Sequence, residues 1–330
     1  MTSDLNNPAG RTGESARPDR ARPSRPIRPA GWASAVPGRA GTAVLAAMTG
    51  SVMVGFLPIT ARCLYAEGVS APSLLFWRYA IGLLVIGLAA GFARIDLVRE
   101  GRRGAFRLTL IGATLGAAQT LCYFESLRWL ETSTAVLLFY TYPALTLIIE
   151  RLWFRHPVRR ISVLCIAMIL VGAALITAPG IDAGRIDPRG LLWAVPGPLI
   201  YAFYLALNAR LMGRHPPLAG AAFLYLGFGL TYLGAALVLG LRMPQSALGW
   251  AAILFIALGA GALSITLFSY AVPRLGPSSY AIVANTELVT VVVVGALLLG
   301  EQMTANRAAG ALLIAAGILV HGLSRRPPPG

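Results

Sequence analysis

Ten apolar runs alternate with short polar segments along almost the whole chain. A helix needs about 20 predominantly apolar residues to cross a hydrocarbon layer of roughly 30 Å, and each run is close to that length. The connections are short, so no soluble domain is inserted between the runs. The pattern therefore predicts ten transmembrane helices, at residues 41–61, 72–92, 106–126, 133–152, 161–178, 189–211, 219–241, 248–270, 277–299 and 306–323.

The second half of the chain repeats the layout of the first half. The stretch from Leu275 to Val320 contains an apolar run, a short polar hairpin and a second apolar run, and a stretch with the same layout begins 145 residues upstream at Leu130. Few residues are identical at that offset, so the shared layout is the stronger signal. It predicts a duplicated five-helix membrane unit, with one copy at residues 40–178 and the other at residues 189–324.

The segment before the first apolar run has a different character. Residues 1–39 are rich in Arg, Pro, Ser and Gly and contain almost no large apolar side chains. Such a composition cannot bury a core, so we predict a disordered tail followed by a retained signal anchor.

Composition and charge agree with a membrane protein. Hydrophobic residues make up 56% of the chain and charged residues 12%, whereas about a quarter of an average soluble protein is charged. The net charge of +15 comes entirely from arginine, because the chain contains no lysine. This excludes a P-loop lysine and a Schiff-base lysine. The arginines do not form one face with interleaved aromatic residues, so we predict no nucleic-acid partner.

The distribution of arginine predicts the orientation. If the amino terminus is cytoplasmic, 21 of the 28 basic residues lie in cytoplasmic segments, six lie in segments on the opposite side and one, Arg78, lies inside a predicted helix. Positive charge favours the cytoplasmic side of a membrane. We therefore predict a multi-pass protein of the plasma (inner) membrane with both termini in the cytoplasm.

Enzyme and metal signatures are missing from the sequence. The apolar runs contain no His-Glu-x-x-His motif, no Gly-x-Ser-x-Gly motif and no paired aspartates. The cysteines lie in or beside different runs and are predicted to be small buried residues rather than a disulfide or metal set: Cys63, Cys122 and Cys165. The histidines lie at loops or helix ends: His156, His215 and His321. We predict no enzyme activity, no metal and no cofactor.

Two charged residues inside apolar runs are the main candidates for a site. Glu287 lies about ten residues into the ninth run, where a carboxylate facing lipid would cost a few kcal/mol. It is either a substrate or proton site, or a structural carboxyl group that fixes helix packing. Arg78, in the second run, has three open interpretations: it pairs with Glu287, it binds an anionic substrate, or it extends to the membrane interface.

Prolines predict interruptions in two helices. Pro143 lies in the middle of the fourth run, and Pro196 and Pro198 flank Gly197 in the sixth. Membrane helices tolerate such interruptions where the freed carbonyls meet protein or water, which is often at a transport site, although an inert kink is the alternative. Three tyrosines lie near these positions and are candidates for ligand contact or for packing alone: Tyr140, Tyr142 and Tyr204.

These features together resemble the drug/metabolite transporter superfamily, in particular its EamA-type ten-helix members. The resemblance covers essentially residues 41–324 and is carried by Phe76-Trp77-Arg78, by Tyr140-Thr-Tyr-Pro143, by Leu297-Leu-Leu-Gly300-Glu301-Gln-Met-Thr304 and by Gly310-Ala-Leu-Leu-Ile314 with Gly317. The first half departs from the second in two places. His156 occupies the place of Glu301, and Leu288 occupies the place of Pro143.

The resemblance implies an all-α integral membrane protein in which the two five-helix repeats are inverted. It also implies a central cavity surrounded by helices one, three, four, six, eight and nine, alternating access, and movement of small metabolites, often outward. By the same resemblance the cavity residues are Tyr140, Tyr142, Asn285 and Glu287.

We therefore predict a secondary transporter, most simply an exporter, of small organic metabolites such as amino acids or amines. Its partners are the solute and the lipid bilayer, with protons as a candidate coupling ion. One alternative is a major-facilitator-like transporter, because the loop from Gly91 to Arg103 nearly reproduces that group's basic signature. Another is a non-transporting scaffold or accessory subunit.

Overall fold

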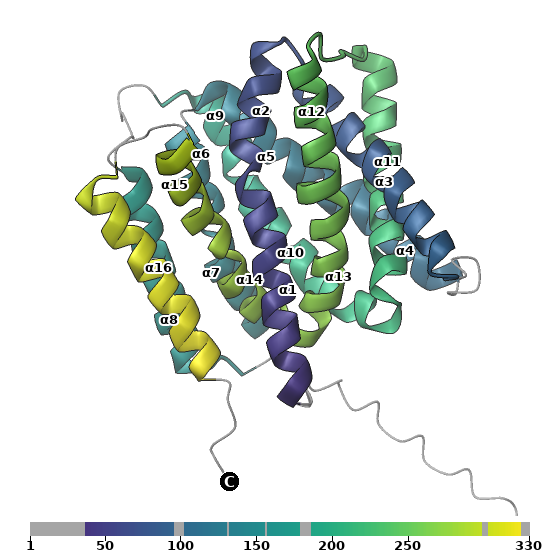
Figure 1. Cartoon of the computed structure of the whole chain (residues 1–330). Coiled ribbons are helices and arrows are strands. Elements are labelled where there is room, and N and C mark those ends of the chain that lie inside the picture. The colour runs from purple at the N-terminus through teal and green to yellow at the C-terminus, as the bar shows by residue number, and fades with distance from the viewer. Residues whose placement is uncertain are drawn as a thin grey trace, which may run out of the picture. The chain divides into compact units, whose positions relative to one another are not determined.

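The structure is a computed structural model that describes residues 37–95, 102–130, 132–155, 157–178, 186–298 and 303–324. Within these ranges every regular element is helical, which confirms the predicted all-α fold (Figure 1). Nine helical stretches in the described part of the chain are long and apolar enough to cross a membrane.

The helices follow the predicted order, and several are interrupted by a turn or a π-helical segment. In chain order they are α1 (Pro37–Gly55), α2 (Leu57–Ala66), α3 (Ala71–Phe92), α4 (Arg102–Ile111), the π-helix η1 (Gly112–Gly116), α5 (Ala117–Trp129), α6 (Thr132–Phe139), α7 (Tyr142–Leu152), α8 (Arg160–Thr177), α9 (Pro188–Ala194), α10 (Pro196–Leu211), the 3₁₀-helix η4 (Met212–Arg214), α11 (Pro217–Leu239), α12 (Ala247–Phe255), the π-helix η5 (Ile256–Leu263), α13 (Ser264–Leu275), α14 (Pro277–Ala284), α15 (Thr286–Leu298) and α16 (Ala305–Leu323).

The third predicted helix is present but is less apolar than the others. Residues 102–129 form a continuous helical stretch made of α4, η1 and α5. This stretch is not among the nine that are apolar enough to span a membrane on composition alone. It carries polar side chains such as Gln119 and Thr120, and both line an internal cavity.

Some predicted features differ from the structure or lie outside the residues that it describes. The predicted tail extends to Arg39, whereas α1 begins at Pro37, and residues 1–36 lie outside the described residues. Glu301 and His156 also lie outside the described residues. Cys63 is exposed on the helix surface, so its predicted burial is wrong, while Cys122 and Cys165 are buried.

Proline and glycine account for many helix boundaries. Proline occupies the first or second position of seven helices: α2, α3, α7, α9, α10, α11 and α14. Its missing N–H group would have no partner in the first turn anyway, so it starts a helix at little cost. Gly240 and Gly276 end α11 and α13 with φ of +80° and +82°, a conformation that disfavours side chains.

Helices from the two halves pack against one another. The second helix of each half makes a pair, α3 with α11, and the last helix of each half makes another, α8 with α16 (Figure 1). A Cβ atom on Gly172 of α8 would lie 2.7 Å from the Gly310 carbonyl oxygen of α16, so this pair depends on glycine at the contact. The core is therefore shared between the halves.

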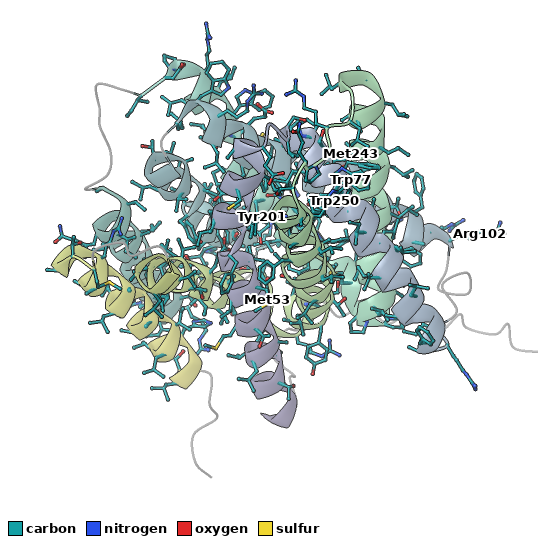
Figure 2. The ribbon with its side chains drawn as sticks, turned by 45° about the horizontal axis from the view of Figure 1, so that its top comes forward. Met53, Trp77, Arg102, Tyr201, Met243 and Trp250 are labelled. Carbon is teal, nitrogen blue, oxygen red and sulfur yellow. The ribbon has the colours of Figure 1, made fainter. Side chains whose placement is uncertain are left out.

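Aromatic contacts tie α3 to α12 as well. Trp77 and Trp250 lie beside each other in Figure 2, and their rings pack edge to face with centroids 5.3 Å apart. This contact holds α3, which carries Arg78, against the helix that continues into η5.

Candidate functional site

Four interruptions divide interior helices, and they fall at matching places in the two halves. Phe56 separates α1 from α2, and Val195 separates α9 from α10. Tyr140 begins the turn between α6 and α7, and Asn285 separates α14 from α15. Tyr140 and Asn285 are 145 residues apart, which is the offset of the sequence repeat. Interrupted helices that meet in the middle of a membrane protein often form its transport site.

Two π-helical segments show the same duplication. η1 lies in the third helical stretch and η5 in the eighth. A π-helical turn changes the i→i+4 bonding pattern and leaves carbonyl groups available for other donors. The Thr231 hydroxyl donates to the Ala113 carbonyl of η1 at 2.8 Å, and the Arg78 guanidinium donates to the Ala260 carbonyl of η5 at 2.8 Å. In each half, the second helix therefore binds the π-segment of the other half.

A cavity of about 140 Å³ lies between these elements. Side chains from α1, α2, α3, α5, α6, α7, α10, α11, α13, α14, α15 and the segment η5 line it. The helices implied by the family resemblance are all represented. The second and seventh helical stretches contribute in addition, through residues such as Arg78 of α3 and Tyr225 of α11.

Glu287 is the acidic residue of the cavity wall among the described lining residues. Its side chain is half-buried and projects from the first turn of α15, directly after the interruption at Asn285. The free N–H groups and positive dipole end of a helix favour a carboxylate in that turn. The Tyr140 hydroxyl lies within hydrogen-bonding range of the Glu287 carboxyl group.

Arg78 lines the same cavity. Its side chain is only 9% exposed, and its guanidinium carbon lies 5.4 Å from the centroid of the Tyr79 ring. The prediction that it extends to the membrane interface is therefore wrong. Arg78 forms no ion pair with Glu287, both residues being in the described part of the chain.

The other predicted site residues divide into two groups. Tyr142 and Tyr204 line the cavity with Glu287 and Arg78. Tyr140 and Asn285 are buried and do not line it: Tyr140 contacts Glu287, and the Asn285 amide donates to the Ala281 carbonyl at 2.6 Å. The prolines also lie outside the lining and mark interruptions: Pro143 in the first turn of α7, and Pro196 and Pro198 in the first turn of α10.

Most of the cavity wall is aromatic, and the sequence predictions missed much of it. Tyr201, labelled in Figure 2, stands 4.8 Å from Tyr142 and 5.9 Å from Tyr204 between ring centroids. Tyr79 stacks on Phe228 with centroids 4.4 Å apart. Tyr201 lies one helical turn before Tyr204, so the i, i+3 spacing was a signal for its shared face.

A comparison with known protein families identifies the family to which this chain belongs. The profile of the EamA-like transporter family matches residues 41–178 and 188–323, which together are most of the chain. The chain belongs to the EamA-like transporter family. As an EamA-like transporter it is a multi-pass membrane protein, and members of its family are transporters rather than enzymes. This confirms the resemblance stated above and sets aside the major-facilitator-like alternative.

A solved structure gives the same fold. A crystal structure described only as "Crystal structure of protein" is 19% identical to this EamA-like transporter and covers 87% of it and 98% of its own chain, with a TM-score of 0.73. At this identity the likeness shows the fold and nothing about the solute. The search of curated proteins found no match.

Two loops of this EamA-like transporter are joined by a contact whose residues do not line the cavity. Glu67 follows the first membrane-spanning stretch and accepts hydrogen bonds from the backbone N–H groups of Gln245 and Ser246 and from the Ser246 hydroxyl. The Ser246 hydroxyl and then these backbone groups lower the pKa of the Glu67 carboxyl group. Arg242 adds a bond to the Gly68 carbonyl at 3.3 Å.

This contact predicts a sensitivity to acid. A carboxyl group whose pKa is lowered on folding stabilises the fold above its unfolded pKa of about 4.3, and loses that contribution as the pH falls through the lowered value. We expect wild type to have a higher Tm than Glu67→Gln at about pH 7 and the difference to shrink as the pH falls below about 4. Thermal unfolding of both purified proteins measures it. A difference that is unchanged by pH would show that the Glu67 charge does not hold the loops together.

Proposed function

We propose that this EamA-like protein is a secondary transporter of small organic solutes such as amino acids or amines. The observation that carries the proposal is the cavity. Both halves of the chain line it, and its described lining residues include one carboxyl group, at an interrupted helix. Its volume of about 140 Å³ is on the order of ten water molecules by the same measure, which suits one small solute.

The residues on the cavity wall have proposed roles. Glu287, Tyr142, Tyr204 and Arg78 contact the solute, because all four line the cavity. Tyr140 and Asn285 support Glu287 and the α14–α15 interruption from behind. The helix interruptions are maintained by prolines, which serve as hinge positions in alternating access: Pro143, Pro196 and Pro198.

The topology completes the proposal. We infer inverted repeats at residues 40–178 and 189–324 and a location in the plasma membrane. Both termini are placed in the cytoplasm, because arginine is concentrated in the segments that would then be cytoplasmic. Export is the proposed direction. A proton gradient or the gradient of the solute supplies the energy, and Glu287 is the group that would exchange a proton for an amine.

A growth screen followed by a flux assay tests this function. Cells expressing the protein should tolerate toxic amino acids and amines better than cells carrying an empty vector, because export lowers their internal concentration. The solute found in this way should then exchange across vesicles containing the purified protein and not across empty vesicles. Equal tolerance in all conditions, together with no exchange, would favour a scaffold or accessory subunit instead.

A further inference from the structure

Arg78 is a buried cation that forms no direct ion pair with any residue the structure describes, although it interacts at longer range with the Glu287 carboxyl group. Its Nη2 atom donates to the Ala260 carbonyl, its guanidinium lies within hydrogen-bonding range of the Tyr225 hydroxyl, and its Nε atom is buried with no hydrogen-bond partner in the described structure. None of these partners is an anion. A buried charge that is left unpaired is strongly unfavourable. We therefore expect an anion to bind Arg78 at some stage of the transport cycle.

The duplication supplies an internal control for the structural role of Arg78. In the other half, Thr231 of α11 binds the Ala113 carbonyl of η1 at the same 2.8 Å as Arg78 binds the Ala260 carbonyl of η5. A neutral hydroxyl group is therefore sufficient to join the second helix of one half to the π-segment of the other. The positive charge of Arg78 is not required for that contact, which indicates a further role for it.

The cavity wall thus carries two opposite charges that form no direct ion pair. Arg78 comes from α3 and Glu287 from α15, and both line the cavity without forming an ion pair in the described structure. The wall around them is aromatic, with residues such as Tyr142 and Tyr201. A solute with an anionic group, an ammonium group and a flat apolar body would match all three parts.

We propose that Arg78 binds the carboxylate of the transported solute, so that the cavity selects small zwitterions whose ammonium group binds Glu287. This inference rests on the proposed transport function and specifies its substrate class. The free Nε–H group and the planar guanidinium suit a carboxylate better than a lysine ammonium would. The aromatic wall accepts the apolar part of the solute.

Three probes share a phenyl ring and differ in the charged groups that they carry: phenylalanine has both groups, phenethylamine only the ammonium and 3-phenylpropionate only the carboxylate. Their binding to the purified full chain is measured by isothermal titration calorimetry. Wild type is expected to bind phenylalanine most tightly. Arg78→Gln retains an N–H donor for Ala260 but loses the charge, so it should weaken phenylalanine roughly tenfold or more while keeping phenethylamine. Retained phenethylamine binding also shows that the variant is folded.

Arg274→Gln is the matched control. Arg274 also donates to a backbone carbonyl, that of Tyr270 at 2.7 Å, and lies over an aromatic ring, but it does not line the cavity. Its variant should keep the wild-type ranking of the three probes. An Arg78→Gln variant that weakens all three equally, or keeps their ranking, would overturn the proposal, as would a wild type that binds none of them.

Flux of radiolabelled phenylalanine in vesicles separates this inference from the function on which it rests. Binding that depends on Arg78 without any flux would support the carboxylate site and contradict transport. Flux that Arg78→Gln leaves unchanged would support transport and overturn the carboxylate site.

Discussion

Glu287→Gln is expected to lower solute flux at least roughly tenfold and to remove its response to a proton gradient. A hydrogen bond to a charged group contributes about 1.5–3 kcal/mol, which corresponds to roughly 10- to 150-fold in affinity. Glutamine has nearly the same shape and still offers an acceptor to the Tyr140 hydroxyl. It loses both the negative charge for an ammonium group and the site for a proton.

The measurement is exchange in vesicles containing the purified variant, with and without an imposed pH difference. Glu287→Asp keeps the charge on a shorter side chain and should retain part of the flux. Glu150→Gln is the control, because the Glu150 carboxylate accepts from the Ser278 N–H group at 3.2 Å and does not line the cavity. Wild-type flux with an unchanged pH response in Glu287→Gln would remove Glu287 from the site.

Some helix interruptions were visible in the sequence, and others were not. Pro143 and Pro196 predict the interruptions at their positions, because proline lacks the N–H group that a continuous helix requires. No proline accompanies the interruption at Asn285. There the Asn285 amide donates to the Ala281 carbonyl and the Thr286 hydroxyl donates to the Val283 carbonyl, so side chains compete with the helical bonds. Many membrane helices contain such residues without being interrupted.

The charged and the aromatic residues of the site also differ in how easily they are recognised in the sequence. Glu287 and Arg78 stand out in a linear sequence, because ionised groups are costly in an apolar run. Tyr201 and Tyr280, which also lines the cavity, do not stand out. An aromatic residue in a membrane helix packs against neighbours as readily as it lines a cavity. The contact of Arg78 was also beyond prediction, because it depends on a carbonyl that the π-segment η5 makes available.

Gly227→Ala is expected to destabilise the protein severely or to prevent its folding. Gly227 of α11 packs directly on the π-segment η1, where a Cβ atom would overlap the Thr109 carbonyl oxygen and lie 2.6 Å from the Ala113 nitrogen. Both are backbone atoms, which cannot rotate away as a side chain can. Overpacking in a core costs about 1–3 kcal/mol, and separating the helices would also break the bond from Thr231 to the Ala113 carbonyl.

Gly234→Ala is the matched control on the same helix. A Cβ atom on Gly234 would meet nothing within 4 Å, so only the helix propensity changes, which favours alanine by about 0.5–1 kcal/mol. Thermal unfolding and size-exclusion chromatography of the two purified variants measure the difference. We expect Gly234→Ala to match or exceed the Tm of wild type and Gly227→Ala to unfold far below it or to aggregate. Equal Tm values would show that α11 can move away from η1 at little cost, and that the contact between the two halves at this point does not need a glycine.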